Sequence, residues 1–233
     1  MTLRANRIIV LSKSELNTLI DTYRIIPQKI ELIPNGVGRH FFTSLEQEKS
    51  EENSIEMAFI GRLCKQKGID VLFDALEILN TNGVKSKVSI IGGSYEEDSF
   101  EKYIRNRASS APLSNLVSFV GQIQNQEIPS FLQKKPIYVQ PSRYESQGIA
   151  LLEAMAFGRV IIASDLPAIR EYVISGYNGL LVEPCNPVLL ANSLLMLHRD
   201  LNLQKKMASL AQQTAQKYQW NATVEKTLEV LLG

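Results

Sequence analysis

Two glutamates lie on either side of a glycine in the segment 141–158, which reads PSRYESQGIALLEAMAFG. Glu145 comes three residues before Gly148, and Glu153 comes five residues after it, inside the helix that the glycine is expected to open. The unbonded N–H groups at a helix start form an anion site, and Glu153 would lie roughly 7.5 Å further along the axis. Such a site suits a ligand with hydroxyl groups on both sides of its phosphates. Spacing alone leaves open an amphipathic helix with one solvated glutamate.

A second candidate loop carries two cations. The run GRLCKQKG at 61–68 leaves a predicted strand and enters a predicted helix. Arg62 and Lys67 are five residues apart across this loop, so both can converge on one diphosphate. Arg offers a planar fork of donors, and Lys offers a compact charge. The alternative is a pair of solvated loop cations.

Other common site patterns are weak or absent. Gly92 and Gly93 follow a predicted strand and would let the backbone approach a ligand, but the run is not the GxGxxG of dinucleotide folds. The sequence contains no GxxxxGK[ST] phosphate loop, no GxSxG nucleophile elbow and no Cys/His spacing typical of zinc. The two histidines, His40 and His198, are predicted to be surface or structural residues.

Strand-like and helix-like runs alternate along almost the whole chain. This alternation, with continuously apolar strands, predicts an α/β fold with a parallel sheet and helices on both faces. Ligands bind beyond the carboxyl ends of such strands, so the residues that follow strands should gather on one rim. The predicted strands are 7–11, 29–33, 55–60, 84–91, 117–120, 137–140, 160–163 and 179–182. The predicted helices are 12–23, 69–79, 100–108, 127–134, 149–157, 169–174, 188–199, 203–218 and 222–231.

Composition narrows the class of protein. The chain has 233 residues, 45% of them hydrophobic, and a formal net charge of +1. It therefore suits one large α/β domain or two small ones and gives no electrostatic reason to bind nucleic acid. No apolar run reaches the ~18 residues of a membrane span, and the basic N-terminus lacks a signal-peptide core. We therefore expect a cytoplasmic protein with reduced cysteines and a linker at 46–53.

Six motifs occur in an order that identifies a family. They are IPNGV (33–37), GRLxxxKG (61–68), VSFVG (117–121), PSxYESxGxxLLEAMAxG (141–158), VIIASD (160–165) and GYNGLLVEP (176–184). Together they resemble the C-terminal half of the retaining GT-B glycosyltransferases, the glycosyl transferases group 1. The glutamate pair resembles the E-x7-E motif of that group. The likeness covers the chain from residue 7 to its end.

The resemblance implies a Rossmann-like domain that binds a nucleotide-diphosphate sugar and transfers the sugar with retention, without a cofactor or an obligatory metal. It implies that Arg62 and Lys67 hold the diphosphate, that Glu153 takes the ribose hydroxyls and that Glu145 lies beside the sugar. The leaving diphosphate would accept the proton of the incoming hydroxyl, and the two cations and the helix start would stabilise its charge. The implied catalytic residues are Glu145, Arg62 and Lys67. The other implied donor contacts are Gly61, Val120, Gly121, Ser146, Gln147, Gly148, Ile149, Ala150 and Glu153, with 120–122 near the base.

The chain departs from the family pattern at three points. Gln147 stands where the family often has Phe, and 166–168 replace the usual Gly-Gly after Asp165. The largest departure is length, because the acceptor-binding N-terminal half is missing. Residues 1–45 resemble the remnant of that half and the interdomain hinge, and residues 46–233 resemble the donor domain with its C-terminal helices.

These observations favour the donor half of a retaining glycosyltransferase, whose acceptor domain belongs to a longer chain or to a partner. Membrane association would then come only through the absent domain. The alternative is a non-catalytic nucleotide-sugar-binding module, and the Glu145–Glu153 spacing argues against a related epimerase. Apolar surface on 1–45 and on the helix near Trp220 should be exposed, which makes a homodimer one outcome.

Overall fold

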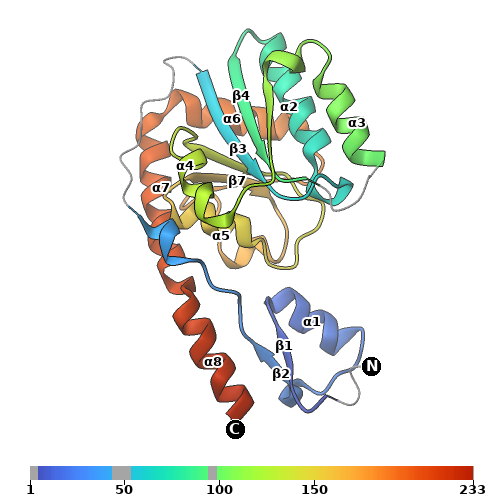
Figure 1. Cartoon of the computed structure of the whole chain (residues 1–233), viewed down its shortest axis with the longest axis vertical. Helices are drawn as coiled ribbons and strands as arrows, with labels where there is room; N and C mark the ends of the chain where they lie inside the picture. The colour runs from blue at the N-terminus through green and yellow to red at the C-terminus, as the bar shows by residue number, and fades with distance from the viewer. Residues whose placement is uncertain (1–4, 44–53, 94–98, 233) are drawn as a thin grey trace.

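The large unit of the chain is built on one parallel sheet of six strands (Figure 1). The computed structural model describes residues 5–43, 54–93 and 99–232, so the predicted linker at 46–53 lies outside the described residues. The strand order is β5-β4-β3-β6-β7-β8, and every neighbouring pair is parallel. The strands are β3 (Ser54–Ile60), β4 (Lys85–Ile91), β5 (Val117–Gly121), β6 (Ile137–Gln140), β7 (Val160–Ser164) and β8 (Leu180–Val182), each close to its prediction.

Helices cover both faces of this sheet, which confirms the predicted fold class. On one face pack α2 (Ile69–Thr81), α3 (Ser99–Ala108) and α6 (Pro187–Arg199). On the other pack α4 (Ile128–Leu132) and α5 (Ile149–Ala156), while α7 (Leu201–Ala215) contributes to both hydrophobic clusters. The loop after β3 contributes Leu63 to the first cluster, whereas Arg62 and Lys67 of the same loop stay outside the apolar core.

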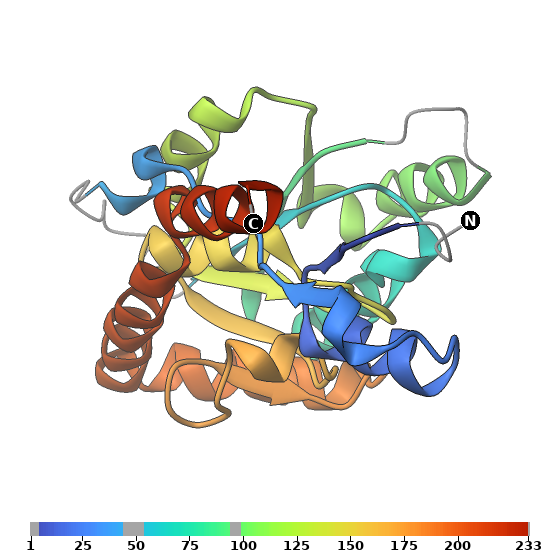
Figure 2. The same ribbon diagram turned by 90° about the horizontal axis from the view of Figure 1, so that it is seen from below.

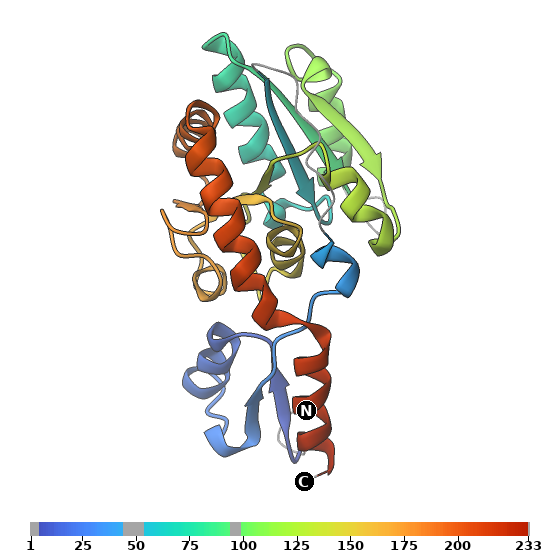
Figure 3. The same cartoon turned by 90° about the vertical axis from the view of Figure 1, so that its left-hand side faces the viewer.

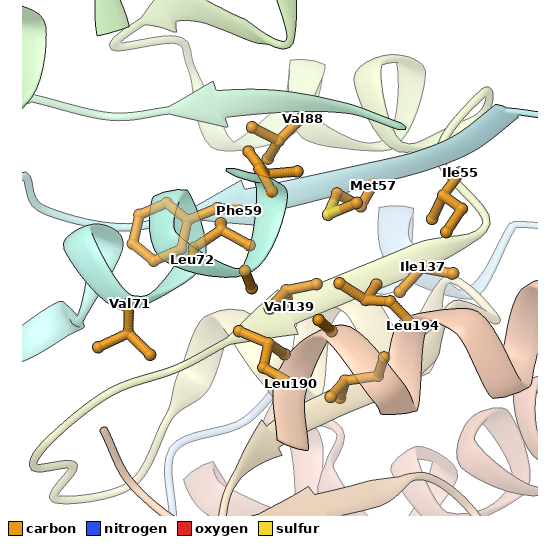
Figure 4. Packing of buried hydrophobic residues seen from close by; sticks show 14 of the residues in the cluster. Ile55, Met57, Phe59, Val71, Leu72, Val88, Ile137, Val139, Leu190 and Leu194 are labelled. Carbon is orange, nitrogen blue, oxygen red and sulfur yellow. The ribbon is translucent and has the colours of Figure 1, made fainter. Parts of the chain in front are cut away.

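The core follows from the two-residue alternation of strand side chains. In β3, Ile55, Met57 and Phe59 pack on the first face, whereas Ala58 belongs to the cluster on the second. Figure 4 shows Met57 across from Leu194 of α6. Each such large apolar side chain contributes about 1.5–3 kcal/mol by leaving water. This packing fixes the strand ends from which the site loops start.

Three predicted helices are shortened or divided in the structure. The stretch 169–174 forms only one turn of 3-10 helix, η7 (Ile169–Glu171), because the Asn178 side chain takes the groups that would continue it. Its Oδ1 accepts from Ile174 N at 2.7 Å, and its Nδ2 donates to Tyr172 O at 2.9 Å. The stretch 127–134 divides into η6 (Asn125–Glu127) and α4, and 203–218 divides into α7 and η8 (Gln216–Tyr218).

A small unit lies at one end of the molecule (Figure 1), and Figure 2 views the molecule from that end. Its strands β1 (Ile8–Val10) and β2 (Ile30–Leu32) pair in parallel, with α1 (Lys13–Asp21) and η2 (Pro27–Lys29) beside them. Ser12 caps α1, since its Oγ accepts from Glu15 N at 3.1 Å. The Glu15 carboxylate accepts from Leu11 N at 2.8 Å, one residue before the N-cap N–H that a capping box uses.

Two chain segments join the units side by side, at a waist that we define as residues 33–37 and 216–223. Val37 N donates to Tyr218 O at 2.7 Å, and Thr223 Oγ1 donates to Pro34 O at 2.8 Å. The helix α8 (Trp220–Leu232) begins within the waist and extends toward the end that holds the small unit (Figure 3). Phe41, in η3 (Arg39–Phe42), is already buried in the core of the large unit, and the predicted boundary at 45/46 stays a prediction.

The waist leaves no room for a side chain at Gly36. A Cβ there would lie 2.4 Å from Trp220 Cα and 2.5 Å from Trp220 N, which are backbone atoms. We expect Gly36→Ala to lower the free energy of unfolding by about 1–3 kcal/mol, the usual cost of overpacking, in urea denaturation. Gly93→Ala is the matched control, because its Cβ would meet only the Gln122 side chain at 3.5 Å. Equal losses in both variants would contradict the close approach.

Candidate functional site

The candidate site lies where the strand order changes direction. The chain runs outward from β3 through β4 to β5 and then returns to β6 on the other side of β3. Loops that follow β3 and β6 therefore diverge from neighbouring strand ends, which is where open parallel sheets bind ligands. The loop after β3 (61–68) and the loop after β6 (141–148) are the two that the sequence singled out.

These two loops are clamped together. Arg143 donates to both carboxylate oxygens of Asp70 at 2.8 Å each and to Lys65 O at 2.7 Å, and its own N–H bonds to Gln66 O at 2.7 Å. Gly68, with φ +68°, lets the loops touch, since a Cβ there would lie 2.0 Å from Pro141 O. Sequence reasoning missed this clamp, because Arg143 and Asp70 are 73 residues apart and share no motif.

The clamp brings Lys67 and Glu145 together. Lys67 Nζ lies 2.5 Å from Glu145 Oε1, and Ser142 Oγ donates to the same oxygen at 2.8 Å. The Glu145 side chain is only 5% exposed, and these two donors hold it at the wall of the site. Arg62 is exposed, and no contact with another described residue holds its side chain. It is therefore available to a ligand in front of the loop.

The start of α5 faces this pair of loops. Gly148 is its N-cap, with φ +82°, and no side chain caps the helix. The first N–H groups belong to the half-buried residues Ile149 and Ala150, and they are among the N–H groups that a helix cannot satisfy internally. A Cβ at position 148 would approach Ile169 Cδ1 at 2.9 Å and Gln140 Nε2 at 3.1 Å. The structure thus places an open helix start between the two glutamates, as the sequence predicted.

Glu153 has a different environment from Glu145. Asn125 Nδ2 donates to Glu153 Oε1 at 2.8 Å, and His40 Nε2 lies 2.8 Å from Asn125 Oδ1. Burial raises the pKa of the Glu153 carboxyl, while the Asn125 hydrogen bond and the nearby His40 lower it to a smaller extent. Burial first, and then the charges of Glu145 and Glu153, raise the pKa of the buried Tyr138 hydroxyl.

The Gln147 side chain is hydrogen-bonded to the waist. Its Nε2 donates to Asn35 O at 3.1 Å, and its Oε1 accepts from Asn35 N at 3.4 Å. The side chain is buried and paired with backbone that belongs to the waist. Its predicted contact with the donor sugar stays a prediction, and the neighbouring Ser146 is half-buried at the same rim.

The remaining predicted contacts lie at adjoining strand ends. Gly92 N donates to Gly121 O at 2.8 Å, and a Cβ at Gly92 would lie 2.1 Å from Gly61 O. Val120 and Gly121 are both half-buried. Gly61 and Gly121 therefore share one rim with the two clamped loops, although Gly61 follows β3, Gly121 ends β5, and β4 lies between these strands.

Neither a metal cluster nor a membrane helix is found in the described part of the chain. Residues 5–43, 54–93 and 99–232 contain no group of three or more His, Cys, Asp or Glu side chains arranged to hold a metal ion. None of the helices in these ranges combines the length and the apolar character needed to cross a membrane.

Comparison with known proteins shows the family. Residues 41–214 match Glycosyl transferases group 1, so the chain belongs to this family. It is 30% identical over 223 residues to an uncharacterised glycosyltransferase of Methanocaldococcus jannaschii, covering 96% of this chain and 58% of the relative. It is 26% identical over 233 residues to a D-inositol 3-phosphate glycosyltransferase of Paenarthrobacter aurescens, covering 97% and 57%. The chain thus spans less than two thirds of the length of these relatives.

Solved structures agree on the Rossmann-like domain of GT-B proteins. The Anabaena protein HepE in complex with UDP-glucose superposes with a TM-score of 0.87 at 22% identity, covering 97% of this chain and 63% of that chain. A sucrose-phosphate synthase from Thermosynechococcus elongatus gives a TM-score of 0.83 at 25% identity, covering 96% and 57%.

The loop clamp generates a stability prediction. We expect Arg143→Ala to lower the free energy of unfolding by about 1.5–3 kcal/mol, because charged hydrogen bonds are lost from a partly buried pair. Arg170→Ala is the matched control, since Arg170 makes a similar two-pronged pair with Asp165 but is 61% exposed. Urea denaturation should show no resolvable change for this control. An Arg143 variant as stable as the control would show that the clamp does not hold the loops.

Proposed function

We propose that the chain is the donor-binding part of a retaining glycosyltransferase, which transfers a sugar from a nucleotide-diphosphate sugar to an acceptor hydroxyl. The observation that carries the proposal is the junction of Lys67, Glu145 and the open start of α5. It combines a cation, a positive helix end and a carboxylate within one wall, which suits a diphosphate with a sugar attached. HepE, which has the same fold, forms a complex with UDP-glucose.

The proposed roles follow the chemistry of each group. Arg62, Lys67 and the first N–H groups of α5 stabilise the negative charge that builds on the leaving diphosphate. Glu145 accepts hydrogen bonds from sugar hydroxyls, and Glu153 does so from the ribose. Val120 and Gly121 lie where backbone contacts would meet the base.

The proposed transfer breaks the bond between the sugar carbon C1 and the diphosphate oxygen. A bond from C1 to the acceptor oxygen forms on the same face, and the acceptor proton passes to the departing diphosphate. No cofactor takes part in this scheme, because the chain's own cations and helix start meet the developing charge. The similarity of the glutamate pair to the E-x7-E motif supports retention.

The acceptor side of this reaction requires additional protein. The chain spans 57–58% of the length of the curated relatives above, and its donor-side groups all come from the large unit. On α8, most apolar side chains are exposed, including Trp220, Val224, Leu228, Leu231 and Leu232. We propose that the acceptor-binding part, in the same or another polypeptide, packs against this helix and the small unit. A second copy of the chain is the alternative occupant.

A second candidate function is a nucleotide-sugar-binding module that transfers nothing. The groups described above all serve donor binding, which such a module would share with the enzyme. The two functions separate in one assay, in which the chain is mixed with an acceptor-binding half from a relative. Sugar transfer by the mixture would support the enzyme, whereas nucleotide binding without transfer would support the module.

Arg62 offers the sharpest test of donor binding. We expect Arg62→Ala to weaken nucleoside diphosphate binding by about tenfold without changing stability, since charged hydrogen bonds to phosphate are lost and no described residue loses a partner. Isothermal titration with UDP, GDP and ADP would measure the affinity and indicate the base. Lys205→Ala, which removes an exposed charge from α7, is the control.

The outcome has two separate failure modes. If the native chain binds none of the three nucleotides at millimolar concentration, the donor-binding function is wrong. If it binds one of them but Arg62→Ala and Lys205→Ala behave alike, the function stands and the assignment of Arg62 is wrong.

A further inference from the structure

A hydrogen-bonded chain of three side chains ends on Glu153. His40 comes from η3 just after the waist, Asn125 from η6 after β5, and Glu153 from α5. The two contacts that link them are both 2.8 Å long. The three residues are up to 113 positions apart in the sequence, so only the fold brings them together.

The chemistry of the three groups fixes the orientation of the Asn125 amide and the position of the proton on His40. An ionised carboxylate only accepts hydrogen bonds, so Asn125 must present its NH2 group to Glu153. The Asn125 carbonyl then faces His40 and requires a donor, so His40 Nε2 must carry its proton. His40 therefore holds the amide in the orientation that serves Glu153.

Local packing holds His40 in that place. Its ring centroid lies 4.5 Å from that of the buried Phe41. A Cβ at Gly38 would lie 2.4 Å from His40 Cε1, so the absence of a side chain at 38 makes room for the ring. The backbone at Gly38 has φ −65° and ψ 142°, which any residue adopts. A side chain at position 38 would therefore clash with the His40 ring but would not strain the backbone.

The hydrogen bonds among these three side chains leave one carboxylate oxygen of Glu153 for a ligand. Oε1 accepts from Asn125, and no hydrogen bond from another described residue reaches Oε2. We propose that Asn125 and His40 are positioning residues that aim Glu153 Oε2 at the ribose hydroxyls of the donor nucleotide. This inference rests on the proposed function and assigns to it two residues outside the glutamate and cation motifs.

The same contacts help to keep Glu153 ionised. Burial raises the pKa of its carboxyl, and the Asn125 hydrogen bond and the charge of His40 oppose that shift. Tyr138, whose pKa the charge of Glu153 helps to raise, directs its hydroxyl to Gln140 Oε1 at 2.9 Å. A protonated Glu153 would lose an acceptor, so the positioning residues also widen the pH range in which it can bind a hydroxyl.

The test compares two ligands that differ only at the ribose. The probes are the nucleoside diphosphate that binds best among UDP, GDP and ADP, and its 2′,3′-dideoxy analogue. We expect Asn125→Ala to weaken binding of the ribose form by about tenfold and to leave the dideoxy form within about twofold. His40→Ala and Gly38→Ala should give smaller losses in the same direction, because they free or displace the group that orients Asn125. Asn106→Ala and His198→Ala, at sites in α3 and α6, are the matched controls.

A pH series adds a readout that a merely structural role would not change. The ratio of the two affinities cancels the titration of the phosphate, which both ligands share. Without the Asn125 donor the pKa of Glu153 rises further, so the preference for the ribose form should fall at a higher pH in Asn125→Ala than in the native chain.

Each result decides something. If the native chain binds no nucleotide, the proposed function fails. If it binds but Asn125→Ala weakens both ligands equally, leaves both unchanged or strengthens the ribose form, the positioning role is overturned and the proposed function stands.

Discussion

Contact between the loops that follow β3 and β6 is the constraint on which the candidate site depends. The strands lie next to each other in the sheet, but their loops lead to different helices and would be independent without a clamp. The Arg143 guanidinium donates hydrogen bonds to the Asp70 carboxylate and to the Lys65 carbonyl. Gly68 has no side chain that would keep the two loops apart. As a result Lys67 and Glu145, 78 residues apart in the sequence, meet at 2.5 Å. The charges of the site thus follow from how closely two backbones approach.

The two glutamates show how one residue type acquires two characters. Glu145 is fixed by a cation and a hydroxyl, whereas Glu153 is fixed by a neutral amide in a buried setting that raises its pKa. The helix start between them carries partial positive charge without a side chain. This arrangement places positive charge in the centre and acceptors on both flanks, which matches a ligand with phosphates in the middle and hydroxyls at each end.

The waist connects the site loop to the small unit. The loop that carries Glu145 also carries Gln147, whose amide holds the backbone of Asn35 in both directions. The carboxylate of Glu171 accepts from Lys13 N at 2.8 Å, so the start of α1 is bound to the large unit as well. A movement of the small unit would therefore displace the loop that forms one wall of the site. Gln147, which departs from the family pattern, supplies one of the hydrogen-bonded links between that loop and the waist.

The sequence alone determined the elements and the candidate groups. Continuous apolar runs such as 55–60 predict buried parallel strands, and the glycine at 148 predicts the helix start, because these depend on local periodicity and backbone freedom. The six ordered motifs indicated the family that the comparison then showed. The shortened helix at 169–171 escaped prediction, because a side chain seven residues further on takes its hydrogen bonds.

Only the tertiary structure decided which groups touch. The Arg143 clamp, the pairing of Gln147 with the waist, and the chain from His40 through Asn125 to Glu153 join residues that no short motif contains. His40 was predicted to be a surface or structural residue, and its sequence neighbours give no sign of the carboxylate that it serves through Asn125. Hydrogen bonds act over about 3 Å in space, whatever the separation of the two residues along the chain. Which residues become partners therefore depends on how the strands are arranged in the sheet, and a local sequence pattern does not encode that arrangement.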